Sequence, residues 1–268
     1  MFHGCIIHYG FHAYTFIGNG LVNMYAKCGD LKGSIRAFRD ILHKDLVSWN
    51  AMLFAFGLHG KAIQSLQVFE QMVVNGVKAD NVTFIGLLMA CSHSGLIRES
   101  HALFETMQTV YGLSPEKDHV ACMVDLLGRG GYLAEAKELA AKYCSLYSAK
   151  TSLCVALLGA CSAHGELGLG NILGETLKIS ETHNETSYVL LSNLYCASGQ
   201  WKEAEMVRKT MADQGVKKIP GCSWIEVRNK VTAFVAGKHS NPFIGELCNV
   251  LQYIDFEMRN PYFVDINN

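Results

Sequence analysis

A glycine recurs every 31 to 36 residues along most of this chain. The recurring positions are Gly29, Gly60, Gly95, Gly131, Gly165 and Gly199. A fixed period in this range is typical of solenoids, in which each repeat is one helical hairpin that buries its apolar face only by stacking on its neighbours. The spacing therefore predicts six stacked hairpins, each with a glycine at its turn.

Two further positions keep a fixed distance from each glycine. A large apolar residue stands eight residues before it, at Leu21, Met52, Leu87, Met123, Leu157 and Leu191. A small residue stands five residues after it, at Ser34, Ser65, Ser100, Ala136, Gly170 and Ala204. The large residue buries the first helix, the glycine allows the left-handed turn, and the small residue lets the second helix cross closely. We therefore predict an all-α fold, a right-handed α-solenoid with helices of roughly 12 to 14 residues.

Composition excludes some classes of function. The chain has 268 residues, 50% of them hydrophobic, and a net charge of −1, so bulk charge gives no signal for nucleic acid. None of the ten cysteines forms a Cys-x-x-Cys pair, which argues against a zinc ribbon, and scattered thiols are typical of a reducing compartment. The uncharged first 26 residues contain three histidines and four glycines, which a membrane span disfavours, and they match neither a signal peptide nor an organelle presequence.

Several phrases decide between the known helical repeats. "NGLVNMYAKCGDL", "LLGACSAHGELGLG", "PGCSWIEV" and "FVAGKHSNP" stand in the sequence. They resemble the plant pentatricopeptide repeat proteins of the PLS subclass, in which repeats of three lengths alternate and an E/E+ extension follows. The resemblance covers residues 1 to about 258. It favours this family over the tetratricopeptide repeats that the period alone would also allow.

The resemblance implies a layout for the chain. Residues 1–14 resemble the tail of a repeat, so we expect a fragment truncated at its N-terminus. Four repeats follow at 15–45, 46–80, 81–116 and 117–150. Two tetratricopeptide-like E motifs then fill 151–218, an E+ like extension with a short β-hairpin around Arg228–Lys230 fills 219–258, and a tail without a match covers 259–268.

Family members bind single-stranded RNA, and the resemblance names the residues that would read it. One base is read per repeat by the fifth and last residues, while the second residue packs on the base. In this sequence the two pairs are Asn19 with Asp45 and Asn50 with Asp80, a combination that favours uridine in the family. The packing positions hold Phe16 and Val47.

The next two repeats depart from this rule. Ile85 and Ala121 occupy the fifth position, and neither side chain can form a hydrogen bond with a base. Glu116 is the last residue of the third repeat. The sequence therefore predicts at most two reading repeats, and weak binding by this chain alone.

Structural roles remain open for the same residues. Asn19 and Asn50 could cap or solvate a helix, since asparagine favours such places. Trp49 and Trp224 are expected to pack rather than to stack on bases. The alternative function is a tetratricopeptide-like protein-interaction scaffold, or a degenerate fragment, that does not read RNA.

We do not expect an enzyme. Family members often end in a cytidine deaminase, whose signature is His-x-Glu followed by Pro-Cys-x-x-Cys. His183–Asn184–Glu185 matches the first half, but the zinc-binding cysteines are missing, and zinc needs three protein ligands. The resemblance instead implies a site-recognition factor for C-to-U editing of mitochondrial or chloroplast RNA. Residues 151–258 would recruit a deaminase-bearing partner or an editing accessory factor, with no cofactor and no membrane.

Overall fold

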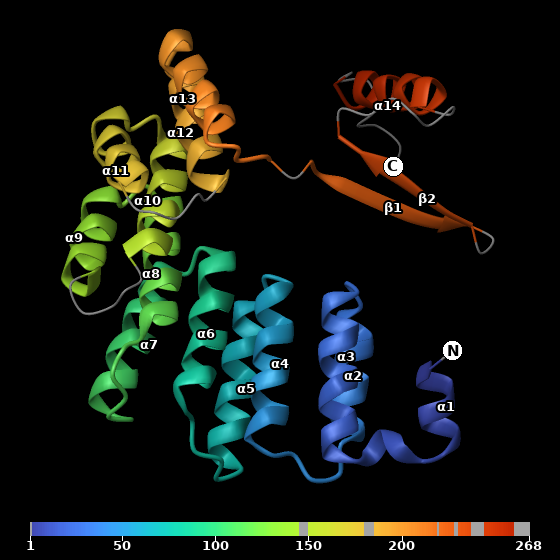
Figure 1. The fold of residues 1–268 in the computed structure, drawn as a ribbon. Coiled ribbons are helices and arrows are strands. Elements are labelled where there is room, and N and C mark those ends of the chain that lie inside the picture. Colours follow the sequence, from blue (N-terminus) through green and yellow to red (C-terminus); the bar gives the residue numbers. More distant parts are fainter. Residues whose placement is uncertain are drawn as a thin grey trace, which may run out of the picture. The chain divides into compact units, whose positions relative to one another are not determined.

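The computed structural model describes residues 2–144, 150–179, 185–218, 220–227, 230–236 and 244–259. The chain divides into two compact units, Met1–Val216 and Lys217–Asn268. The first unit contains the helical repeats. The second contains a β-hairpin and one helix (Figure 1).

The first unit begins with α1 (Phe2–His8) and a short 3-10 helix (Phe11–Ala13). Twelve helices then pair into six hairpins in the described part of the chain: α2 (Thr15–Lys27) with α3 (Leu31–Asp40), α4 (Leu46–Leu58) with α5 (Ala62–Val74), α6 (Asn81–Ser94) with α7 (Ile97–Thr109), α8 (Lys117–Arg129) with α9 (Leu133–Cys144), α10 (Lys150–His164) with α11 (Leu167–Ile179), and α12 (Glu185–Ala197) with α13 (Trp201–Asp213).

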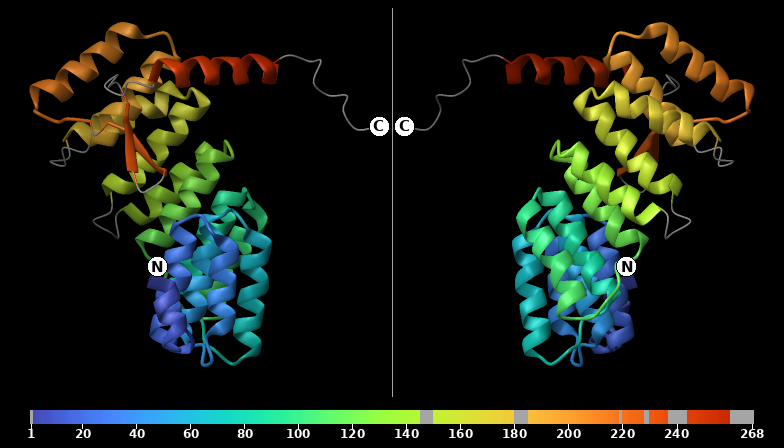
Figure 2. Two further views of the ribbon diagram at one scale, coloured as in Figure 1. Left: turned by 90° about the vertical axis from the view of Figure 1, so that its right-hand side faces the viewer. Right: turned by 90° about the vertical axis from the view of Figure 1, so that its left-hand side faces the viewer.

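The hairpins stack through their first helices. α2 contacts α4, α4 contacts α6, and the series continues through α8 and α10 to α12. Each second helix packs on the first helix of its own hairpin, and those of the first five hairpins also pack on the first helix of the next one. Figures 1 and 2 show this succession within the first unit, from blue α2 to orange α13. The predicted α-solenoid is confirmed.

The turn glycines have the backbone that their positions demand. All six have positive φ, between 61° at Gly60 and 82° at Gly29 and Gly131, a region that side chains with a Cβ rarely adopt. A second series, which the sequence analysis missed, follows the second helices at Gly76, Gly112 and Gly215, again with positive φ. Both ends of these hairpins are therefore closed by left-handed glycines.

The core contains the residues that the period selected. The six large residues before the glycines are all at most 5% exposed, and the small residues after them are buried as well. The Ser34 hydroxyl donates a hydrogen bond to the backbone oxygen of Val22, which joins the two helices of one hairpin. Trp49 is buried edge-on against Phe38, as predicted for a packing residue. The same prediction is wrong for Trp224, which is 70% exposed on a strand of the second unit.

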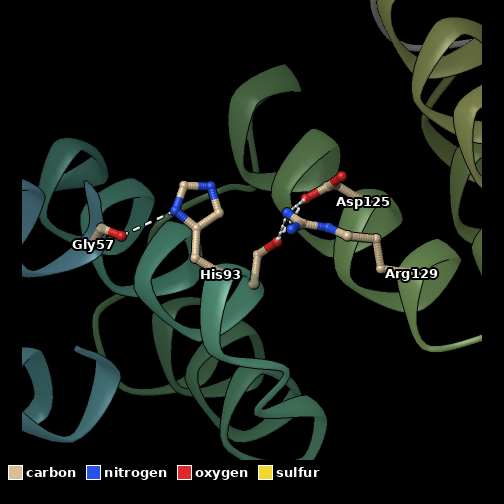
Figure 3. Close-up of polar contacts among 5 residues, drawn as sticks. Gly57, His93, Asp125 and Arg129 are labelled. Atoms are coloured by element: carbon tan, nitrogen blue, oxygen red, sulfur yellow. Dashed lines mark hydrogen bonds and ion pairs between the residues drawn. The ribbon is translucent and has the colours of Figure 1, made fainter. Parts of the chain in front are cut away.

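Polar contacts join successive hairpins where the first helices end. His59 bonds the backbone oxygen of Ala26, His93 that of Gly57 at 2.9 Å, and His164 that of Arg129. The oxygens of Ala26 and Gly57 already accept from the backbone N–H of Gly29 and Gly60, so at these two junctions the histidine adds a second bond that crosses between hairpins. At the junction between α6 and α8 the Ser92 hydroxyl bonds Asp125 at 2.7 Å, and Arg129 contacts both (Figure 3).

The second unit contains two antiparallel strands, β1 (Cys222–Val227) and β2 (Lys230–Val235), and α14 (Ile244–Arg259). Val227 pairs with Lys230, so the predicted hairpin is confirmed, although Arg228 and Asn229 at its turn lie outside the described residues. The helix α14 was not expected from the sequence. In the part of the chain that is described, no helix is long and apolar enough to span a bilayer.

Candidate nucleic-acid interface

The structure brings Asn19 and Asp45 together across the junction between the first two hairpins. Asp45 is the N-cap residue of α4, and its Oδ1 accepts hydrogen bonds from the Ser48 backbone N–H and from the Ser48 hydroxyl. Asn19 lies in the second turn of α2 and donates from Nδ2 to the same oxygen at 3.3 Å. Because α4 packs on α2, the capping carboxylate of one helix meets an amide from the helix before it.

Asn50 and Asp80 repeat this arrangement at the next junction. Asp80 is the N-cap residue of α6, its Oδ1 accepts from Thr83 N–H, and Asn50 Nδ2 donates to it at 3.1 Å. The Thr83 hydroxyl lies 2.8 Å from both Asp80 Oδ1 and Asn50 Oδ1 and can donate to one of them at a time. The two amides differ here, because Asn19 Oδ1 is buried without a hydrogen-bond partner.

These contacts keep each carboxylate ionised and use only one of its two oxygens. Burial, the largest influence, raises the pKa of Asp45, but the hydrogen bonds from Ser48 and Asn19 together outweigh it and the net pKa is lowered. The pKa of Asp80 is lowered in the same way by Thr83 and Asn50. The hydrogen bonds found among the described residues all reach Oδ1, so Oδ2 of each aspartate is left to accept from a ligand.

Exposed apolar side chains accompany the pairs. Phe16, Val47 and Val82 are the second residues of α2, α4 and α6, and they are 88%, 58% and 44% exposed. Since the first helices stack side by side, these three residues form a row beside the two amide–carboxylate pairs. A planar base inserted between neighbours of this row would contact an apolar side chain and reach the polar pair with its edge.

The asparagines do not have the capping role that the sequence left open. Both are only 7% exposed, and each bonds the N-cap residue of the following first helix rather than the start of its own. Ile85 and Ala121 are partly buried and offer no polar group, as expected. The structure contains a third amide–carboxylate contact, in which Asn81 Nδ2 donates to Glu116 Oε1 at 2.6 Å. The rule based on the fifth residue of each repeat does not find it, since Asn81 is the first residue of its repeat.

Acid should weaken the caps that build the site. Both aspartates have a folded pKa below the ordinary value of about 3.9, so their contribution to stability is complete above that pH and is lost as the pH falls through the folded values. We expect the thermal midpoint of the protein to fall between pH 5 and pH 3. The double variant Asp45→Asn/Asp80→Asn keeps residues that cap helices but cannot titrate, so its midpoint should fall less steeply in circular dichroism melts. Parallel slopes for the two proteins would contradict this assignment.

The thiols next to the repeat turns are packing groups. Cys91 and Cys161 are buried, and burial raises the pKa of each thiol to about 11. Burial also raises the pKa of Cys122, to about 12, so these groups stay protonated near neutral pH. Cys28 is exposed, which shows that packing does not account for every cysteine near a turn.

In the described part of the chain, no three histidine, cysteine or acidic side chains are grouped so as to hold a metal ion. Of the His183–Asn184–Glu185 triplet, only Glu185 falls within the described residues, as the first residue of α12.

Stacked helical hairpins with a polar pair at successive junctions define a helical repeat protein, and comparisons identify which kind. The family model described as PPR repeat matches residues 47–77 and 82–109, and that of the E motif matches residues 164–226. A mitochondrial pentatricopeptide repeat-containing protein of Arabidopsis thaliana is 56% identical over 263 residues, which is 97% of this chain and 42% of the relative. A chloroplastic one from the same plant is 41% identical over 91% of this chain and 33% of the relative.

Solved structures agree on the fold. The pentatricopeptide repeat protein PPR10 in complex with an 18-nucleotide psaJ RNA element superimposes with a TM-score of 0.64 at 18% identity, over 74% of this chain and 30% of PPR10. The structure of PPR10 from maize gives 0.59 at 20% identity, over 74% of this chain and 29% of PPR10. The chain thus belongs to the pentatricopeptide repeat proteins and carries an E motif. It spans less than half the length of these curated relatives.

Proposed function

We propose that this chain binds single-stranded RNA through the junctions between its first three hairpins. The observation that carries the proposal is the repeated pair of an amide and a capping carboxylate with a free oxygen, set beside the exposed row of Phe16, Val47 and Val82. A scaffold needs neither the repetition of the pair nor an exposed aromatic residue beside it.

The atoms of each pair match the edge of uridine. An asparagine Nδ2 carries two hydrogens, one of which bonds the aspartate. The other can donate to a uridine carbonyl oxygen while the free aspartate Oδ2 accepts from the uridine N3–H. Asn19 with Asp45 would read one uridine, and Asn50 with Asp80 would read the next one toward the 3′ end, since family members run parallel to their RNA.

Affinity should be modest in this chain alone. The net charge of −1 implies little release of counterions, which supplies much of the affinity of nucleic-acid-binding proteins. Specificity rather than affinity is therefore the property to measure.

We further propose that the chain serves as a recognition factor for C-to-U editing of organelle RNA. Residues 15–150 would read the RNA, while 151–218 and 219–258 would recruit a deaminase in trans. The E motif match and the names of the relatives, which place them in mitochondria or chloroplasts, support this role. Co-purification of a cytidine deaminase with the full chain but not with residues 1–150 would test it. Failure to retain a deaminase would leave RNA binding without the editing role.

Replacing Asp80 with asparagine should change the base that the second pair prefers. The substitution adds an amide donor where the carboxylate accepted, and a donor suits the N3 acceptor of cytidine rather than the N3–H of uridine. We expect the preference for uridine over cytidine at the second position to fall by about tenfold, as for loss of one specific hydrogen bond. Competition between UU and UC targets, with these repeats placed in a longer array, measures the ratio.

Asparagine remains a good N-cap residue, so Asp80→Asn should leave the melting midpoint nearly unchanged at pH 7. The preference at the first position, set by Asn19 and Asp45, serves as the internal control. An unchanged ratio at the second position would favour the scaffold. That alternative draws support from the burial of both asparagines, which also hold successive helices together.

A further inference from the structure

We propose that Asn81 and Glu116 form a third base-reading pair, at the junction between α6 and α8, and that it favours uridine. The inference rests on the proposed RNA binding. It departs from the fifth-residue rule, because the fifth residue of this repeat is Ile85. Asn81 is the first residue of α6, so the amide comes from a different position of the repeat.

The contact has the same parts as the two pairs before it. Glu116 is the N-cap residue of α8, as Asp80 is of α6. Asn81 Nδ2 donates to Glu116 Oε1 at 2.6 Å, so an amide from one first helix again meets the capping carboxylate of the next. The longer glutamate side chain compensates for an amide that starts one turn earlier in its helix.

Asn81 shares a second feature with Asn19. The Oδ1 atom of each is buried and has no hydrogen-bond partner, whereas Asn50 Oδ1 lies beside the Thr83 hydroxyl. An unpaired buried acceptor is unfavourable, so both amides keep a polar atom that the free protein leaves unsatisfied. The third junction therefore has the polar signature of the first.

His119 holds the third pair in place. It is fully buried, its Nδ1 accepts from the Glu116 backbone N–H at 3.0 Å, and its Nε2 lies 2.9 Å from the backbone oxygen of Asn81. The ring thereby ties the N-cap residue of α8 to the first residue of α6. Ser48 and Thr83 occupy the same place in the earlier caps and accept from the backbone N–H of their own N-cap residue. The Thr83 hydroxyl also lies 2.8 Å from Asn50 Oδ1, but the bond from His119 reaches a backbone oxygen of the preceding first helix. The third pair is thus fixed by an added link between helices.

The apolar surroundings are poorer than at the second pair. Val82 offers one exposed wall, but the second residue of α8 is Asp118, which gives no apolar contact on the other side. The third junction should accordingly contribute discrimination between bases more than affinity.

The test uses the full chain and a set of fluorescein-labelled RNAs that carry uridine at the first three positions, with each base in turn substituted at the second or at the third position. Anisotropy titrations at low salt compare the wild type with Asn81→Leu and Glu116→Gln. Leucine is the residue that α4 carries at the same position, Leu46, so this variant keeps a side chain that such a helix start tolerates. We expect the wild type to prefer uridine at the third position by about threefold to tenfold, as for one net hydrogen bond. Both variants should reduce that preference to less than about twofold, while the second-position preference stays.

Asp80→Asn in the same assay separates the two hypotheses. Suppose that Asp80→Asn alters the second-position preference. If the wild type then shows no third-position preference, or if Asn81→Leu and Glu116→Gln leave that preference unchanged, base reading occurs at the second junction but not at the third. If none of the variants alters any preference, base reading itself is wrong. Should Asn81→Leu lower the melting midpoint, Glu116→Gln decides the third position, because glutamine keeps the length of the side chain.

Discussion

Phe84→Ala is expected to lower the free energy of unfolding by about 3–5 kcal/mol, the range for removing a buried phenylalanine. Phe84 is fully buried at the start of α6. Its ring centroid lies 5.9 Å from that of Phe69 in α5 and 5.1 Å from that of Tyr111 after α7, so it packs between two hairpins. The loss should therefore weaken the stacking of neighbours as well as one repeat. Urea titration followed by circular dichroism measures it.

Phe16→Ala is the matched control for stability. The same side chain is removed from the start of another first helix, but Phe16 is largely exposed, so the free energy of unfolding should change by no more than about 0.5 kcal/mol. Stacked repeats can unfold in parts, so the comparison uses the whole unfolding curve rather than one fitted value. A loss below about 1 kcal/mol for Phe84→Ala would show that the interface between these hairpins is loosely packed.

Phe16→Ala should instead weaken RNA binding, by about fivefold to a hundredfold, which corresponds to the 1–3 kcal/mol measured for stacking of one base on an aromatic ring. The reason is that Phe16 is the one aromatic residue of the exposed row and lies beside the Asn19–Asp45 pair. Anisotropy titrations with a uridine-rich oligonucleotide at low salt measure the change.

Trp201→Ala is the control for this second result. Trp201 is an exposed aromatic residue at the first position of α13, far along the chain from the pairs. Its loss should leave affinity for the oligonucleotide unchanged. Equal effects of the two substitutions would mean that exposed rings bind RNA without regard to the row, and an absence of effect for Phe16→Ala would remove the row from the interface.

The fold could be predicted from the sequence because its determinants are periodic. A turn glycine such as Gly95 needs a left-handed backbone, and Leu87 and Ser100 must be buried at fixed distances from it, so the spacing reports the geometry directly. The helix α14 and the exposure of Trp224 could not be predicted in this way. They belong to a segment that occurs once, where no second copy shows which face is buried.

Only part of the candidate site could be predicted from the sequence, for a related reason. Asn19, Asn50 and their aspartates occupy equivalent positions, so a rule based on position finds them, and the structure brings each pair into contact. Asn81 reaches Glu116 from a different position and so does not follow the repeat frame. His119 stands at the cap position of Ser48 and Thr83, but its longer side chain makes a contact that position alone does not reveal. Similarly, the histidines that bond the preceding first helix have backbone oxygens as partners. Every residue carries such an oxygen, so the sequence does not show which one a histidine will bond.

Each amide–carboxylate pair belongs to two hairpins at once. Asn50 is contributed by α4, whereas Asp80 starts α6, and the hydrogen bond between them crosses the junction. Whole hairpins are therefore the wrong blocks for recombination, whether by a protein engineer or by unequal crossing-over in a genome. A block cut just before Asp80 would inherit one half of a pair and leave the other half behind, whereas a block that runs from Leu46 through Asp80 would carry the complete Asn50–Asp80 pair to its new place.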